Sequence, residues 1–192
     1  MKKHVKTRFC ELITSAPPSV ASRAFLACHA IPFLHGSKKA KALPPLEQTL
    51  LATQEGDELE LDEMWSFVKK RKNKRWLWLA LCQRTRQIVA YALGSRGIKT
   101  CRLLWQRIPQ SYKRSLCYSD FWKAYPSVVP SEQHRASERK GKTNHIERFN
   151  NTLRQRLARL VRRTLSFSKI NTMHEVTIKL FIHYYNAQCS PR

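Results

Sequence analysis

Three acidic residues in this chain stand where a metal site for phosphate chemistry would need them. Asp62 lies in LELDEMWSFV, Asp120 ends the apolar run RSLCYSD, and Glu147 opens a long basic helical pattern. Magnesium prefers oxygen ligands and keeps several waters, so a few carboxylates suffice to bind it. Two such ions ~3.5–4 Å apart can assist both the attacking and the leaving oxygen of a phosphodiester. The acids therefore predict a site for two ions, Mg²⁺ or Mn²⁺, facing a nucleic-acid phosphate.

These carboxylates stand out because the chain is strongly cationic. It has 36 Lys plus Arg against 13 Asp plus Glu in 192 residues, which gives a net charge of +23. A charge of this size favours a polyanionic partner. DNA or RNA fits better than an anionic membrane, because the sequence shows no clean amphipathic anchor. The acids that follow Glu63 are Asp120, Glu132, Glu138, Glu147 and Glu175.

Each acid taken alone also has an ordinary structural explanation. An aspartate after a strand, such as Asp120, is commonly a turn residue. Glu147 could pair with Asn144 in a capping box, and Asp62 could face solvent from a strand. Glu63 competes with Asp62 for the first ligand position. Since neighbouring strand residues point to opposite faces, only one of these two is expected to join the site.

Apolar patterning predicts elements that would bring the acids together. The first three predicted strands are joined by short connections, which favours antiparallel hairpins, and a helix then crosses over to a strand that returns parallel. Parallel neighbours present side chains at the same sheet edge, so Asp62 and Asp120 are expected near each other. The expected strands are 59–68, 75–82, 87–94, 114–120 and about 132–137, and the expected helices are 99–107, 144–163 and 172–186.

This order of elements predicts an α/β fold with a mixed sheet of about five strands and helices on both faces. Residues 1–36 show no convincing periodicity and read as a poorly defined segment, a remnant or disordered. Residues 37–58 read as a linker with a short helix, and residues 59–192 as the catalytic domain.

Cysteine spacing and hydropathy bear on the cellular compartment. No cysteines have the close spacing of a zinc site, and Cys82 and Cys117 lie in apolar runs typical of core residues. No segment reaches ~18 uninterrupted apolar residues, so neither a membrane span nor secretion is predicted. A reducing cytoplasm fits this composition.

Basic residues gather in the connection after the first strand, in the loop before the Glu147 helix, and on that helix. Charge runs are often solvated faces, but the net charge favours contact with phosphates. Such contacts carry no sequence information. The predicted DNA contacts are Lys69, Lys70, Arg71, Lys72, Lys74, Arg139, Lys140, Lys142, Arg148, Asn151, Arg154, Arg159, Arg163 and Lys169.

The segments LDEMWSFV, YSDFWKAY, NHIERFNNTLRQRLARLVRRTLSFSK and INTMHEVTIKLFIHYYN resemble transposases of the insertion-sequence-one family, of the InsB or InsAB type. The resemblance runs from about residue 38 to the C-terminus. It implies a ribonuclease-H-like DDE transposase that uses divalent metal, with Asp62, Asp120 and Glu147 as the matching acids. It further implies cleavage at terminal inverted repeats and strand transfer into target DNA. A homo-oligomer bridging two ends, in the bacterial cytoplasm at the nucleoid, belongs to the same expectation.

Other parts of the resemblance leave alternatives open. Asn150 and Arg154 match the pattern around the glutamate, and 166–169 matches a Ser-Phe-Ser-Lys segment that is either a DNA-contacting loop or a helix-connecting turn. Full-length members of this family resemble proteins in which a zinc-finger and helix-turn-helix module precedes the catalytic domain. Residues 1–36 show no such module. A separate polypeptide could supply that module. The competing hypotheses are a nuclease without strand transfer and an inactive DNA-binding remnant.

Overall fold

The computed structural model describes residues 38–136 and 141–189. The segment 1–36 and the predicted DNA contacts Arg139 and Lys140 therefore lie outside the described residues. In the described part of the chain, no helix combines the length and apolar character needed to span a membrane.

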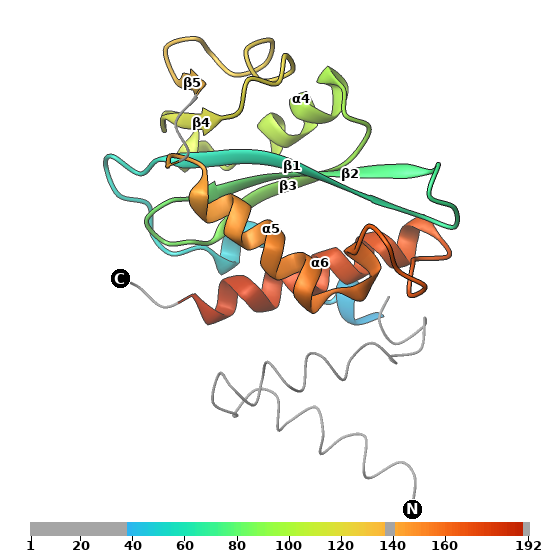
Figure 1. Cartoon of the computed structure of the whole chain (residues 1–192). Helices are drawn as coiled ribbons and strands as arrows, with labels where there is room; N and C mark the ends of the chain where they lie inside the picture. Colours follow the sequence, from blue (N-terminus) through green and yellow to red (C-terminus); the bar gives the residue numbers. More distant parts are fainter. Residues whose placement is uncertain (1–37, 137–140, 190–192) are drawn as a thin grey trace, which may run out of the picture.

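A five-stranded mixed sheet forms the centre of the fold, in the order β3-β2-β1-β4-β5 (Figure 1). The first three strands pair antiparallel, whereas β4 runs parallel to β1 and β5 parallel to β4. This confirms the predicted α/β class and matches a ribonuclease-H-like arrangement. The strands are β1 (Leu59–Phe67), β2 (Lys74–Cys82), β3 (Ile88–Gly94), β4 (Cys117–Ser119) and β5 (His134–Ala136).

Helices cover both faces of the sheet, as predicted. Figure 1 shows α4 (Ile98–Arg107) on one face and α5 (Asn144–Arg156) with α6 (Asn171–Gln188) on the other. Alternate residues of β2 belong to two hydrophobic cores, one on each face of the sheet. Trp78 packs under α4, while Leu79 packs under α5 and α6. The central strands are apolar on both sides for this reason.

Two predicted elements are longer than the observed ones. The strand expected at 114–120 is only three residues long, since the chain turns through Ser115, whose N–H bonds the Tyr112 carbonyl. The helix expected at 144–163 ends at Arg156, because Leu157 adopts an extended conformation. The chain continues as a 3₁₀ helix, Ala158–Leu160, which keeps Leu160 in the core.

Residues before β1 pack against the same domain. A 3₁₀ helix spans Leu46–Thr49. Asn186 of α6 donates to the Thr49 hydroxyl at 3.0 Å, and Gln87 donates to the Thr49 carbonyl at 2.8 Å. His183 contacts the Pro44 carbonyl at 2.9 Å. The segment ahead of β1 is thus tied to α6 and to the residue that precedes β3.

Glu60, buried in β1, fixes the start of α5. Its Oε2 accepts hydrogen bonds from the backbone N–H groups of His145 and Ile146, at 2.9 and 2.8 Å. The first N–H groups of a helix have no partner inside it, so this carboxylate supplies one from another element. The predicted capping box between Asn144 and Glu147 does not form: Thr143 is the cap residue, and its side chain bonds the Glu147 side chain but no backbone N–H of the helix.

A buried histidine joins β1, α6 and the Ser-Phe-Ser-Lys segment. His174 of α6 places Nε2 at 2.9 Å from the Ser66 hydroxyl and Nδ1 at 3.0 Å from the Ser168 hydroxyl. Burial, with the charges of Arg159 and Arg75, lowers the pKa of His174 to about 4. The imidazole is therefore neutral at physiological pH and acts as a structural link.

The Ser-Phe-Ser-Lys segment docks on the end of β1. Val68 and Ser168 form a parallel bridge, and the Lys69 N–H donates to the Ser168 carbonyl at 2.8 Å. The Phe67 and Phe167 rings lie 5.7 Å apart. This connection between the 3₁₀ helix and α6 therefore lies against the turn end of the β1–β2 hairpin.

Glu60→Ala is expected to destabilise the fold by about 2–4 kcal/mol, because it leaves buried N–H groups of α5 without an acceptor. Guanidinium unfolding monitored by circular dichroism measures this. Glu132→Ala, at an exposed acid bonded to Ser131, is the matched control and should stay within about 0.5 kcal/mol of wild type. A Glu60→Ala protein as stable as this control would contradict the role given to Glu60.

The folded protein is expected to lose stability as pH falls from about 6.5 to about 4 through His174. In that window the unfolded imidazole, with a pKa near 6.5, takes up a proton that the folded one does not bind. The loss approaches about 1.4 kcal/mol per pH unit. Unfolding titrations of wild type and His174→Gln at several pH values check it, since other titrating groups are common to both. Equal slopes in the two proteins would contradict this assignment.

Candidate functional site

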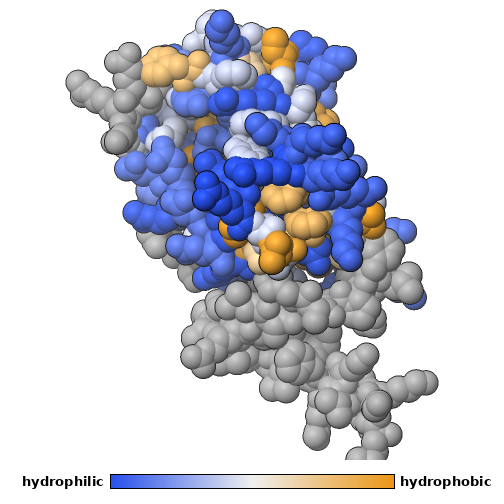
Figure 2. All heavy atoms as spheres, turned by 45° about the vertical axis from the view of Figure 1, so that its right-hand side comes forward, coloured by the Kyte–Doolittle hydropathy of each residue, from blue (hydrophilic) through white to orange (hydrophobic). Residues whose placement is uncertain are grey.

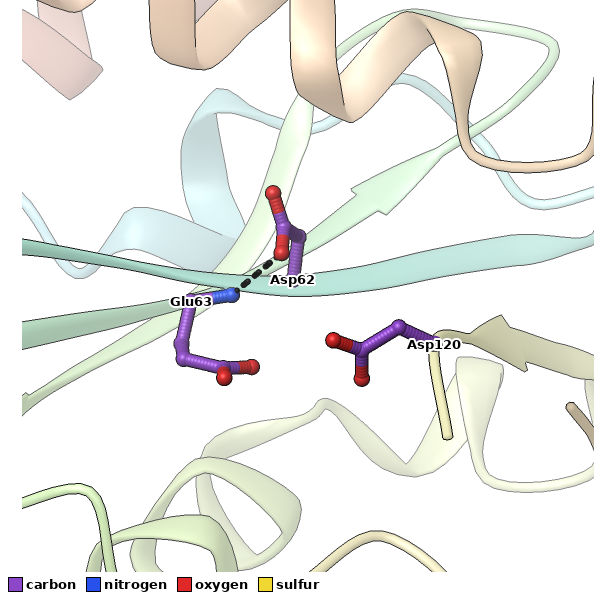
Figure 3. Close-up of side chains that lie close together, drawn as sticks. All are labelled: Asp62, Glu63 and Asp120. Carbon is purple, nitrogen blue, oxygen red and sulfur yellow. Dashed lines mark hydrogen bonds between the residues drawn. The ribbon is translucent and has the colours of Figure 1, made fainter. Parts of the chain in front are cut away.

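Three carboxylates meet where β1 passes the end of β4 (Figure 3). Asp62, Glu63 and Asp120 each offer one oxygen, and these oxygens lie within 4.8 Å of one another. β4 pairs with β1 only at Leu59 and Glu60, so the β1 edge beside Asp62 has no neighbouring strand. Asp120, the residue after β4, reaches this uncovered edge.

Asp62 and Glu63 both reach the cluster, although strand alternation was expected to place only one of them there. Figure 3 shows the two side chains leaving β1 on opposite sides, while Asp120 faces them from the end of β4. Strand alternation holds, but β4 stops at Ser119. Carboxylates from both faces can therefore reach around the free edge of β1.

Asp62 is held from α5 and by its own backbone. Asn150 donates to Oδ2 at 2.6 Å, and the Glu63 N–H donates to Oδ1 at 2.8 Å. Burial and the nearby negative charges of Glu63 and Asp120 raise the pKa of Asp62 to about 7. Concentrated negative charge of this kind favours either a proton or a cation.

Glu63 is buried and bonded at both oxygens. Arg96 Nε donates to Oε1 at 2.8 Å, and a terminal nitrogen of Arg96 forms an ion pair with the same oxygen at 2.7 Å. The Tyr125 hydroxyl donates to Oε2 at 2.7 Å. Burial is the main cause that raises the pKa of Glu63, and the bonds from Tyr125 and Arg96 oppose it. Both oxygens of the Glu63 carboxylate are thus held in place by other side chains.

Asp120 and Glu147 are both exposed. Asp120 Oδ1 accepts a bond from the Trp122 N–H at 3.0 Å. Glu147 accepts one from the Thr143 hydroxyl at 3.0 Å and does not belong to the group within 4.8 Å. It lies one helical turn before Asn150, the residue that contacts Asp62. The structure therefore brings two of the three predicted ligands together and leaves the third one turn away on α5.

The chemistry of the cluster suits a hard divalent cation. All of its donors are carboxylate oxygens, which Mg²⁺ and Mn²⁺ accept, whereas zinc prefers nitrogen and sulfur. Asp62 and Glu63 come from a strand in the core of the sheet, and Asp120 directly follows the end of β4. A strand holds ligands more accurately than a loop does.

Some of the predicted DNA contacts are exposed, whereas others already form contacts within the protein, and we call the latter engaged. Arg154 is engaged: it donates to the carbonyls of Leu160 at 2.9 Å and Trp65 at 3.4 Å, which holds the chain after α5 against β1. Arg159 is partly buried. Lys142 pairs with Glu58 at 3.4 Å while remaining exposed. The other described contacts that are exposed are Lys69, Lys70, Arg71, Lys72, Lys74, Arg148, Asn151, Arg163 and Lys169.

Two segments far apart in sequence share this positive charge. The β1–β2 connection carries Lys69–Lys72, and its base is bonded to the segment that ends in Lys169. Figure 2 shows a face where hydrophilic side chains surround small apolar patches. The arrangement suits a polyanion that contacts several cations at once.

The sequence analysis missed two residues that bond the acidic cluster, Arg96 and Tyr125. Arg96 lies between β3 and α4, and nothing in the periodicity links it to Glu63. Tyr125 stands within YSDFWKAY but reads there as an ordinary apolar residue. The one available signal was that a buried acid such as Glu63 needs hydrogen-bond donors, which a cationic side chain can supply.

The chain matches known insertion-element proteins. The model of the IS1 transposase family matches residues 58–188. InsB of insertion element iso-IS1n from Shigella dysenteriae is 40% identical over 123 residues, 64% of this chain and 92% of that protein. InsB of IS1 from Shigella flexneri is 36% identical over 127 residues, 66% and 92% respectively. InsB of IS1 4 from Escherichia coli K12 is 35% identical over 127 residues, 66% and 72%. With the sheet order and the acidic cluster, this match shows that the chain belongs to the IS1 transposase family.

Proposed function

We propose that this chain is a DDE transposase that cuts DNA at the terminal inverted repeats of its element and joins the freed 3′ ends to target DNA. The observation that carries the proposal is the meeting of Asp62 and Asp120, distant in sequence, within 4.8 Å at the free edge of β1 in a transposase family member. Carboxylates in this arrangement can hold the divalent cations that phosphodiester chemistry needs.

The proposed ligands are Asp62, Asp120 and Glu147. Glu63 lies nearer than Glu147, but Arg96 and Tyr125 already bond both of its oxygens. Glu147 is exposed, accepts a bond from one hydroxyl, and stands on the helix that already contacts Asp62. To bind a cation, Glu147 would give up one exposed hydrogen bond, whereas Glu63 would give up a buried ion pair.

The protein's part in the reaction is positioning and charge. When bound, Mg²⁺ or Mn²⁺ supplies charge neutralisation and a more reactive attacking oxygen. Asn150 orients Asp62, and the Trp122 N–H orients Asp120, so both carboxylates keep their places as DNA enters. No covalent bond between the enzyme and DNA is needed, so no Ser or Tyr nucleophile is assigned.

Exposed cations hold the DNA in this proposal. The β1–β2 connection, the outer side of α5 and the segment 162–169 offer side chains that neutralise phosphates without reading bases. From the family resemblance, the proposal also includes a homo-oligomer bridging two ends in the bacterial cytoplasm, and a separate zinc-finger and helix-turn-helix polypeptide for end recognition.

Asp120→Asn is expected to lower the cleavage rate by about 100- to 1000-fold, because it removes a ligand charge worth several kcal/mol of transition-state stabilisation. Affinity for non-specific duplex should change less than about threefold, since phosphate contacts lie elsewhere. Incubation of a labelled transposon end and target DNA with Mg²⁺ or Mn²⁺, resolved on gels, measures cleavage and joining. Glu175→Gln, at an exposed acid of α6, is the control.

The other outcomes of this assay would each support a different conclusion. Cleavage that persists in Asp120→Asn would remove Asp120 from the ligand set. Hydrolysis without joining by the wild type would identify a nuclease, and duplex binding without either product would identify a DNA-binding remnant.

Replacing Lys70 and Lys72 together by alanine is expected to weaken duplex binding for all sequences alike. The slope of log affinity against log salt should fall by about 2, because each lysine that no longer neutralises a phosphate reduces it by about 1. Fluorescence anisotropy over a salt series measures the slope. The matched control replaces Lys99 and Arg102, two exposed cations of α4, which lies on the face of the sheet opposite α5 and α6. Equal slopes in the two double variants would remove the β1–β2 connection from the DNA surface.

A further inference from the structure

Arg96 lies beside the acidic cluster, with its side chain partly exposed. Its guanidinium carbon lies 4.7 Å from the centre of the Trp76 ring and 3.9 Å from that of Trp122. Its Nε donates to one oxygen of Glu63 at 2.8 Å, and a terminal nitrogen lies 2.7 Å from the same oxygen. The cation thus has aromatic neighbours from two segments and a buried carboxylate along one edge.

These contacts connect β1 to the loop that carries Asp120. The ring of Trp122 contacts Arg96, and the backbone N–H of Trp122 donates to Asp120 Oδ1 at 3.0 Å. Tyr125, later in the same loop, donates to the second oxygen of Glu63 at 2.7 Å. Glu63 is therefore the point on β1 to which the Asp120 loop is attached, and Arg96 is one of its two attachments.

The site needs such an attachment because strand pairing does not provide one. Asp120 is exposed and follows a strand of only three residues, Cys117–Ser119, whose pairing with β1 ends at Glu60. The carboxylates also repel one another across less than 5 Å. The core packing of Ala124 and Tyr125 holds the later part of this loop, and the contacts of Arg96 hold the part next to Asp120.

Arginine suits this position better than lysine. Its planar guanidinium can contact an aromatic face while donating along its edge, and it stays charged at all relevant pH values. A lysine would keep the charge but not the flat contact with Trp122 or the contact of two nitrogens with Glu63. The side chain of Arg96 is 38% exposed, whereas that of Glu63 is 1% exposed.

We propose that Arg96 is a positioning residue: by bonding Glu63 and contacting Trp122, it holds Asp120 at the distance from Asp62 at which a divalent cation binds. Glu63 is then the anchor of the site and not a ligand. This inference rests on the proposed function for the identity of the ligands, but its main test needs neither DNA nor catalysis.

The test measures Mn²⁺ binding to the full chain by titration calorimetry, for wild type, Arg96→Gln and Arg96→Lys. Arg96→Gln is expected to weaken binding by about 10- to 100-fold, the range for residues that orient metal ligands. Arg96→Lys should weaken it by about tenfold or less, since the charge remains. The cleavage rate of Arg96→Gln should recover partly as Mn²⁺ is raised, while duplex affinity without metal stays within about threefold of wild type.

Arg84 offers a matched control. It donates to both oxygens of Asp57, at 2.6 and 2.9 Å, and the Asp57 side chain is 3% exposed, so the pair resembles Arg96 with Glu63 but lies away from the cluster. Arg84→Gln and Arg84→Lys are expected to leave Mn²⁺ affinity within about twofold of wild type.

Clear outcomes would overturn the inference. Mn²⁺ affinity of Arg96→Gln within twofold of wild type, or a wild type that binds no Mn²⁺, ends it. A loss of duplex affinity with Mn²⁺ binding intact would make Arg96 a DNA contact instead. If Arg96→Gln does not fold by circular dichroism, Arg96→Lys and Trp122→Leu carry the same measurement. Wild type that binds Mn²⁺ but neither cuts nor joins DNA would refute the proposed function and leave this inference testable.

Discussion

Electrostatic repulsion at the free edge of β1 is the constraint on which this structure depends. Three carboxylates offer oxygens within 4.8 Å of one another, two of them from successive residues of a strand in the core of the sheet. Unscreened charges at this spacing would drive the loop after β4 outward. The fold opposes this with donors from separate elements: Asn150 from α5, Arg96 from the β3–α4 connection, and Tyr125 from the loop itself.

The same constraint explains how charge is divided over the molecule. Acids are few, and several are buried with donors: Glu60 bonds α5, Glu63 bonds Arg96, and Asp57 bonds Arg84. Many of the cations are exposed, where their repulsion is screened by water and salt. A polyanion can therefore contact the cations without displacing the internal ion pairs, so binding and the integrity of the site are separable properties.

Much of the fold could be predicted from the sequence, because apolar runs and short connections restrict the topology. That reasoning gave the antiparallel hairpins, the parallel return of β4 and hence the meeting of Asp62 with Asp120. It failed where contacts are long-range. The shortness of β4 lets Glu63 join Asp62, and Glu60 replaces the local cap at α5, which fixes where Glu147 stands. No local pattern around Arg96 or Glu60 encodes a partner on another element.

The docking of the Ser-Phe-Ser-Lys segment on β1 has a mechanical consequence. Because Ser168 is bridged to Val68 and tied through His174 to Ser66, the end of β1 cannot swing as a free hairpin would. β1 therefore carries Asp62 near its middle and leads into the basic connection, and its last residue, Phe67, lies about 17 Å from Asp62 by strand rise. Because the docked segment restrains the end of the hairpin, the exposed cations after β1 and the carboxylates near its middle keep a fixed separation.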